Sequence, residues 1–166
     1  MAITIRTRRS HLFLFIALFA ACAGCSSDVR VDYVKSANNI LGDLSAASDE
    51  FAVLLAPWMN GDEFDAEMME AGLAKLRDTI DSVDSRLGSL AVPNDASCKR
   101  LSETLNEFMA FQHEVIEDIE AMVQTMEREN PGSEQTRDLI LEQLVTMNDE
   151  DVVWMKRLRD AAQGVN

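Results

Sequence analysis

Four long stretches of helical hydrophobic spacing, separated by short breaks, place the strongest constraint on the fold of this chain. In each stretch, apolar residues recur at alternating intervals of three and four, which is typical of the buried face of an α-helix. We find no stretch with the strict alternation of a half-buried β-strand. The predicted helices cover about residues 29–56, 62–91, 95–129 and 133–163.

These helices are similar in length, and only a few residues connect each of them to the next. Short connections between long helices make sequence neighbours antiparallel, as in up-down-up-down bundles. The sequence therefore predicts an all-α, antiparallel four-helix bundle over residues 26–166, a length that suits one domain. The alternative architecture is a pair of helical hairpins that pack only when the chain dimerises.

Proline, glycine and capping residues predict where these helices end. Proline lacks an N–H and biases the preceding residue away from the helix, so we expect Pro57 to end the first helix. Asp62 is expected to cap the second helix and Asp95 the third, because a carboxylate accepts hydrogen bonds from the free N–H groups of a first turn. The last break is the Asn-Pro-Gly-Ser sequence at residues 130–133.

Three of the four apolar seams are each interrupted by one polar residue near the predicted middle of the bundle, namely Ser48, Gln112 and Asp151. A buried polar layer can fix the register of packed helices at some cost in stability. The same layer can line a pocket for a small ligand. Partial exposure is a third reading, because a lone carboxylate is costly to bury.

The charge of the chain is strongly acidic. It has 15 Lys and Arg against 29 Asp and Glu, and its first 25 residues contain three Arg and no acid. The remaining residues therefore have 12 cations and 29 acids, a formal charge of −17. Phosphate contacts need Lys and Arg, so nucleic acid is excluded as a partner, and cationic partners or divalent ions are expected instead.

The charges are also unevenly distributed along the predicted bundle. Eight of the twelve cations fall toward the end that holds the start of the first helix, and the opposite end is acidic. This distal end is a candidate docking tip for a basic protein segment or a divalent cation. The candidate tip residues are Trp58, Met59, Asp62, Glu63 and Asp65. The alternative is a solvated surface that serves solubility.

The sequence contains no nucleophile–base pair, phosphate-binding glycine loop or catalytic motif, so we predict a non-enzyme without catalytic residues. His113 is the only histidine after residue 25 and is expected to point outward. A di-iron bundle needs paired Glu-x-x-His motifs, which a single histidine cannot supply, so we expect no metal site and no cofactor.

Two further features have simple structural explanations. Asp78, Asp81 and Asp84 are expected to form a solvated face of the second helix. Cys98 is expected to be a small residue packed in the core.

The first 25 residues have the layout of a secretory signal peptide. Arg6, Arg8 and Arg9 precede an apolar run that begins at Leu12, and small residues follow it. The run is about 13 residues long, whereas a transmembrane helix needs roughly 20. We therefore expect export rather than a membrane-spanning segment.

The sequence Cys22-Ala23-Gly24-Cys25 resembles the lipobox of bacterial lipoproteins. The resemblance covers only the signal segment and implies that Cys25 becomes the first residue and carries a diacylglyceryl thioether and an acylated amine. Cys22 departs from the pattern, because the family favours Leu three places before the modified cysteine, and Cys22 is itself a second candidate. Ser26 is not Asp, which by resemblance favours the outer membrane facing the periplasm. An anchor of two or three chains gives stable membrane attachment.

The sequence thus predicts a membrane-anchored extracytoplasmic lipoprotein, a non-enzymatic helical-bundle interaction or structural protein of the cell envelope. The alternative is a four-helix bundle that binds a metal ion or a small ligand. Methionines near the acidic end leave a Cu(I) site open in that alternative, since thioethers bind this ion. Methionine also commonly fills irregular gaps in a core, which is the expectation here.

Overall fold

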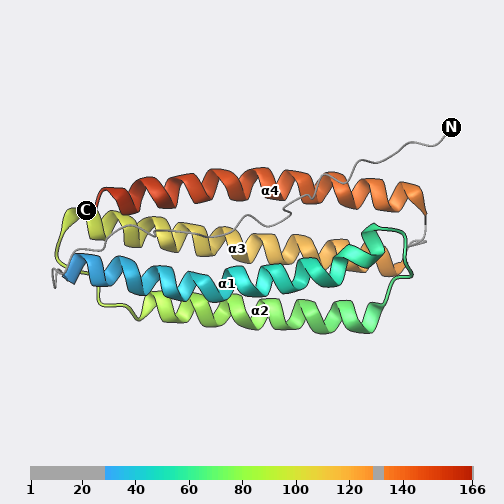
Figure 1. Cartoon of the computed structure of the whole chain (residues 1–166), viewed down its shortest axis with the longest axis horizontal. Helices are drawn as coiled ribbons and strands as arrows, with labels where there is room; N and C mark the ends of the chain where they lie inside the picture. Colours follow the sequence, from blue (N-terminus) through green and yellow to red (C-terminus); the bar gives the residue numbers. More distant parts are fainter. Residues whose placement is uncertain (1–28, 129–132, 166) are drawn as a thin grey trace.

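The computed structural model describes residues 29–128 and 133–165 of the chain. Within these residues the structure is all-helical, with four helices and no strand, which confirms the predicted fold class. The helices are α1 (Val29–Met59), α2 (Ala66–Gly88), α3 (Ala96–Arg128) and α4 (Glu134–Gln163). They lie side by side with their long axes roughly aligned and form a four-helix bundle (Figure 1).

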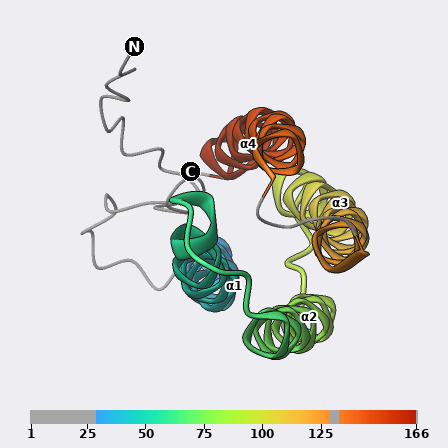
Figure 2. The ribbon, with the colours of Figure 1, turned by 90° about the vertical axis from the view of Figure 1, so that its right-hand side faces the viewer.

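Helices that follow one another in the sequence are also neighbours in space. Close backbone contacts join α1 to α2, α2 to α3 and α3 to α4. Seen end-on, the four helices surround a common centre (Figure 2). The buried side chains of all four helices form one hydrophobic cluster at this centre, so the described residues share a single core.

The predicted seam of the second helix is buried as expected. The spacing of that helix predicts a seam of Met69, Leu73, Leu76, Ile80, Val83, Leu87 and Leu90. All of them except Leu90 are buried. In the first helix the spacing predicts a seam of Val34, Ala37, Leu41, Leu44, Ser48, Phe51 and Leu55. The buried face of α1 is broader than this seam, because Tyr33, Ile40 and Ala47 are buried as well. A wider apolar stripe than a strict heptad seam is what a helix needs when it packs against more than one neighbour.

The end of the first helix differs from the prediction. Helix α1 continues through Pro57 to Met59 instead of ending before the proline. Pro57 lacks only its own N–H, and its carbonyl still accepts from Asn60 at 3.0 Å and from Asp62 at 3.1 Å. Burial of Trp58 in the core also stabilises this last turn of α1.

Of the two helix caps expected from the sequence, Asp62 and Asp95, the structure confirms only Asp95. The carboxylate of Asp95 accepts from the N–H of Ser97 at 2.9 Å, so Asp95 starts α3 as predicted. Helix α2 is capped by Asp65, not by Asp62, because the longer α1 uses Asp62 in its closing turn. Ser133 caps α4 and accepts from the N–H of Thr136 at 3.1 Å.

The predicted signal segment, residues 1–25, and with it Cys22 and Cys25, lies outside the described residues. Among the residues that the structure does describe, none of the helices combines the length and the apolar character needed to cross a membrane.

Candidate functional site

A surface groove lies between α3 and α4. It has a volume of about 640 Å³ and is open to solvent rather than enclosed. Its lining comes from two helices: Glu107, Ala110, Phe111, Glu114, Val115 and Asp118 on α3, and Glu150, Val153, Trp154 and Arg157 on α4. We call this surface the α3–α4 groove.

Aromatic side chains form the floor of the α3–α4 groove. The rings of Phe111 and Trp154 are stacked, with centroids 5.7 Å apart and planes inclined by 29°. Beneath them, the fully buried Phe108 contacts Trp154 at 6.3 Å between ring centroids. The Arg157 guanidinium lies over the Trp154 ring, 4.7 Å from its centroid, in a cation–π contact. The floor is therefore part of the core, and its outer surface faces the groove.

The rim of the α3–α4 groove is acidic. Glu107, Glu114 and Asp118 are exposed on α3, and Glu150 is exposed on α4. Arg157 is the one cation among the ten lining residues. Four carboxylates against one guanidinium around an apolar floor favour a ligand that is both cationic and apolar.

Two of the three predicted polar core residues meet next to this groove. Gln112 is buried at 8% exposure, and its Nε2 donates to Oδ1 of Asp151 at 3.4 Å. Burial raises the pKa of Asp151 to about 6, and the hydrogen bond from Gln112 opposes this shift in part. Ser48 is half-buried on α1, and within the described part of the chain no hydrogen bond joins it to the other two.

The predicted distal tip is only partly a surface. Trp58 is 2% exposed and packs edge-on against Phe64 at 6.4 Å, so it belongs to the core and not to a docking face. Its indole lies inward because the last turn of α1 carries it over the end of the core. Met59 is half-buried, and Asp65 accepts from the N–H of Met68 at 3.0 Å as a helix cap. Asp62 and Glu63 are exposed as expected.

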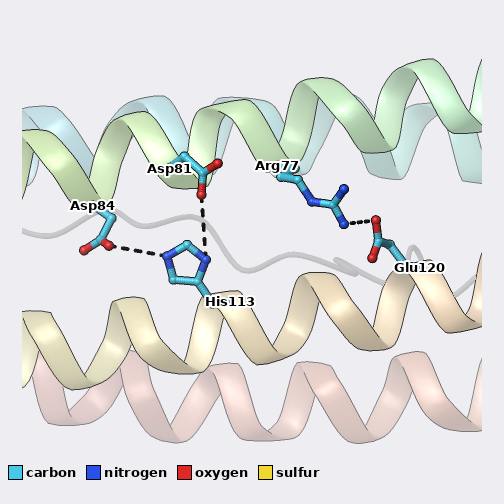
Figure 3. Close-up of polar contacts among 5 residues, drawn as sticks. All are labelled: Arg77, Asp81, Asp84, His113 and Glu120. Atoms are coloured by element: carbon cyan, nitrogen blue, oxygen red, sulfur yellow. Dashed lines mark hydrogen bonds and ion pairs between the residues drawn. The ribbon is translucent and has the colours of Figure 1, made fainter.

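His113 joins α3 to α2 on the opposite side of α3. Its Nε2 lies 3.4 Å from Oδ2 of Asp84, and its Nδ1 lies 3.9 Å from Oδ1 of Asp81. One to two turns away, Arg77 forms an ion pair with Glu120, and all five side chains line the same α2–α3 surface (Figure 3). The outward placement of His113 agrees with the sequence, but Asp81 and Asp84 face this histidine rather than solvent alone.

The described side chains form no candidate metal centre. In residues 29–128 and 133–165, no group of three or more His, Cys, Asp or Glu side chains is arranged to hold a metal ion. Cys98 is fully buried at the start of α3, as expected for a packing residue. Burial also raises the pKa of the neighbouring Tyr33, while a hydrogen bond with Ser102 lowers it.

A second, less polar groove lies between α1 and α2. It has a volume of about 610 Å³, and its apolar lining includes Val53, Leu54 and Met68. Val53 is 70% exposed. Gly72 also lines this groove, and a Cβ at this position would lie against the side chain of Leu54. Glu50 and Lys75 form an ion pair along this groove.

The α3–α4 groove was not predicted from the sequence, although part of it could have been. Glu107, Phe111, Glu114 and Asp118 follow one another at intervals of four, three and four, which places them on one stripe of a helix. This stripe lies beside the buried seam. Because acidic residues are frequent along the whole chain, the sequence does not distinguish this stripe from other exposed acids. Nothing in the sequence indicated that Trp154 and Arg157 would face it across the helix pair.

Comparison of the chain with protein-family models, curated proteins and solved structures gave no match.

Proposed function

We propose that this chain is a membrane-anchored extracytoplasmic lipoprotein that acts as a non-enzymatic interaction protein of the cell envelope. In this proposal it binds a basic protein segment at its acidic surface. The observation that carries the proposal is the α3–α4 groove, where exposed carboxylates surround an aromatic floor. A surface of this composition offers both charge attraction and burial of apolar area to a partner.

The proposal includes an up-down-up-down, antiparallel course of the four helices. Side-chain pairs between neighbouring helices support it. Along each pair of helices, higher residue numbers on one helix pair with lower residue numbers on the other, as expected for antiparallel helices. Between α1 and α2, Asp43 pairs with Arg86 and Glu50 with Lys75. Between α2 and α3, Asp84 lies near His113 and Arg77 pairs with Glu120. The colours along Figure 1 agree with alternating directions.

The anchor would hold the bundle close to a bilayer. Only three residues separate Cys25 from the start of α1 at Val29, and three extended residues reach about 10 Å. With alternating helix directions, α3 starts at the anchored end. Glu107 and Asp118 then lie about 16 and 33 Å along α3 from that end, at 1.5 Å per residue. A partner in the same membrane or in the space beside it can reach the groove.

The location follows from the lipobox resemblance alone. Cys25 would carry the lipid, and Ser26 favours the outer membrane facing the periplasm. The groove replaces the distal tip as the main docking surface in this proposal, because Trp58 is buried. The exposed acids at the distal end, Asp62 and Glu63 among them, remain a second surface for a basic segment or a divalent cation.

The anchor is tested by mass spectrometry of the full chain, purified from membranes of a bacterium that processes lipoproteins. We expect an N-terminal cysteine at position 25 with the added mass of a diacylglyceryl group and one further acyl chain. Cys25→Ser should abolish both the modification and membrane fractionation, and the matched Cys22→Ser should retain them. An intact, unmodified N-terminus, or lipid on Cys22, would contradict the assignment.

The interaction role is tested by cross-linking in the same membranes. A photoreactive amino acid at Val153, which lines the groove and is 52% exposed on α4, should cross-link a partner that carries a basic segment. The same group at Val53, exposed at 70% on α1, is the matched control and should not cross-link it. Cross-linking at neither position, or equal yields at both, would argue against a specific role for this surface.

A further inference from the structure

We infer that the occupant of the α3–α4 groove is a basic amphipathic α-helix of about three turns, and that it displaces Arg157 from the face of Trp154. The inference rests on the proposed function and identifies the chemistry of its partner. An amphipathic helix that lays its apolar face into a hydrophobic groove is a recurring mode of protein recognition.

The length of the groove fits a short helix. Its α3 edge runs from Glu107 to Asp118, a separation of eleven positions or about 16 Å at 1.5 Å per residue. This is about three helical turns of 5.4 Å. Ala110 lies on this edge with an exposed methyl group, so the wall is low there and leaves room for a partner side chain.

The apolar positions of the groove match one face of such a helix. Phe111 and Val115 are half-buried on α3, with Trp154 half-buried and Val153 52% exposed on α4. Phe108 supports them from below, so the floor does not have to form when the partner binds. Apolar side chains at successive turns of a partner helix would cover this floor and exclude water from it.

The charges of the rim select a basic partner. Glu107, Glu114 and Asp118 stand about 10 and 6 Å apart along α3, at 1.5 Å rise per residue. Lys or Arg side chains two turns and one turn apart on the partner would meet them, and Glu150 would bind a cation from the α4 side. An acidic helix of the same apolar pattern would be repelled.

Arg157 occupies a position that a partner cation or apolar side chain would otherwise take. Its guanidinium covers the Trp154 ring at 4.7 Å, and it is the one positive group in the lining. A basic partner therefore meets like charge at this point and has to move the Arg157 side chain. Removing Arg157 should strengthen binding, the opposite of what loss of an ordinary contact residue does.

The probe is a fluorescent peptide of about 14 residues, about 21 Å as a helix, made of Leu at helical spacing and Lys elsewhere. Binding to the full lipidated chain in zwitterionic nanodiscs is followed by fluorescence anisotropy, and empty nanodiscs give the background. Two peptides serve as controls: one of the same composition with Leu scattered over all faces, and one with Glu in place of Lys. We expect saturable binding of the first peptide only.

The quadruple variant E107Q/E114Q/D118N/E150Q should weaken this binding by about tenfold or more at low salt. Ala110→Trp, which fills the groove from an exposed position, should weaken it without any change of charge. Arg157→Leu should strengthen it about threefold, by removing one like charge. The matched control D32N/D43N/D78N/D81N changes net charge equally at exposed positions of α1 and α2, outside both the groove and the distal end, and should leave binding within about twofold. Circular dichroism should show that each variant keeps the helix content of the parent.

Equal weakening by the two quadruple variants would overturn the inference, since binding would then follow net charge and not the groove. Weaker binding by Arg157→Leu, or equal binding of the scattered peptide, would overturn it as well. If the membrane partner still cross-links at position 153 while no basic peptide binds, the inference fails and the proposed function stands. If Cys25 carries no lipid while the peptide binds as expected, the lipoprotein assignment fails and the groove stands.

Discussion

The side-chain amide of Gln112 donates from Nε2 to Oδ1 of Asp151 at 3.4 Å and joins α3 to α4 within the polar part of their interface. Both residues interrupt otherwise apolar seams, and Gln112 is buried. One hydrogen bond does not replace the water that a carboxylate loses on burial, so the pKa of Asp151 rises from 3.8 to about 6. Asp151 therefore keeps its proton to a higher pH in the folded bundle than in the unfolded chain.

Asp151→Asn should stabilise the protein at neutral pH. A folded-state pKa above the unfolded value gives stability that is full below about pH 4 and is lost as pH rises through about 6. Asn has no charge to bury and can still accept from Gln112, so the variant should gain up to about 3 kcal/mol at pH 7.5. Denaturant unfolding at pH 7.5 and at pH 4 measures this difference, which should nearly vanish at the lower pH.

Asp149→Asn is the matched control for this prediction, because Asp149 is exposed on the same helix. It should change stability by less than about 0.5 kcal/mol at either pH. Equal stabilisation by the two variants would show that general charge repulsion, and not burial of Asp151, is responsible.

Trp58→Ala should destabilise the protein strongly. Trp58 is 2% exposed and contacts Phe64, so its removal leaves a large cavity at the end of the core. Truncation of a buried tryptophan costs about 3–5 kcal/mol. The free energy of unfolding in denaturant is the measurement, and Val53→Ala, at a position 70% exposed, should cost less than about 0.5 kcal/mol. A loss of less than about 1 kcal/mol for Trp58→Ala would contradict the burial of this side chain and support its role at a surface tip.

Asp65→Ala should cost about 1 kcal/mol, because Asp65 caps α2 and accepts from the N–H of Met68. Asp65→Asn should retain most of the stability, since an amide oxygen accepts the same hydrogen bond. Asp62→Ala removes the cap that the sequence indicated and should cost less than about 0.5 kcal/mol. Chemical denaturation of the three variants ranks them, and a larger loss for Asp62→Ala would reverse the assignment of the cap.

The ion pair between Arg77 and Glu120 should contribute little to stability, although it joins α2 to α3 (Figure 3). The two side chains are 44% and 29% exposed, so solvent screens their attraction. A double-mutant cycle of Arg77→Gln and Glu120→Gln should give a coupling of about 0.2–1 kcal/mol at low salt. The coupling should fall in about 0.5 M salt, and a salt-independent coupling above about 2 kcal/mol would contradict the prediction.

The residues that the sequence placed correctly are those whose surroundings are set by the helix itself. Leu76, Ile80 and Val83 are buried because regular spacing puts them on one face of any helix that packs at all. Asp95 caps α3 because its carboxylate reaches the N–H groups two and three residues further on. The burial of this face and the cap of α3 both depend on residues only a few positions apart in the sequence. Their arrangement follows from the regular geometry of one helix.

The end of α1 shows where local rules fail. A proline is expected to stop a helix, but the turn after Pro57 persists because the core accepts Trp58 and later N–H groups still find carbonyl partners. That extension moves the cap of α2 from Asp62 to Asp65. Burying an indole stabilises the fold by more free energy than the loss of one backbone hydrogen bond costs. Whether Trp58 is buried depends on the packing of all four helices, so the spacing of residues in α1 alone does not predict it.

The sequence by itself determined four amphipathic helices, their seams and the acidity of the surface, because these depend on composition and on spacing within one helix. Only the tertiary structure decided that Gln112 meets Asp151 and that Phe111 and Trp154 form the floor of one groove, with Glu107 and Glu150 on its rim. The reason is that these pairs are about 40 residues apart, and their distance depends on the rotation and register of α4 against α3. Such relations are set by how two faces pack and are not encoded by the period of either helix.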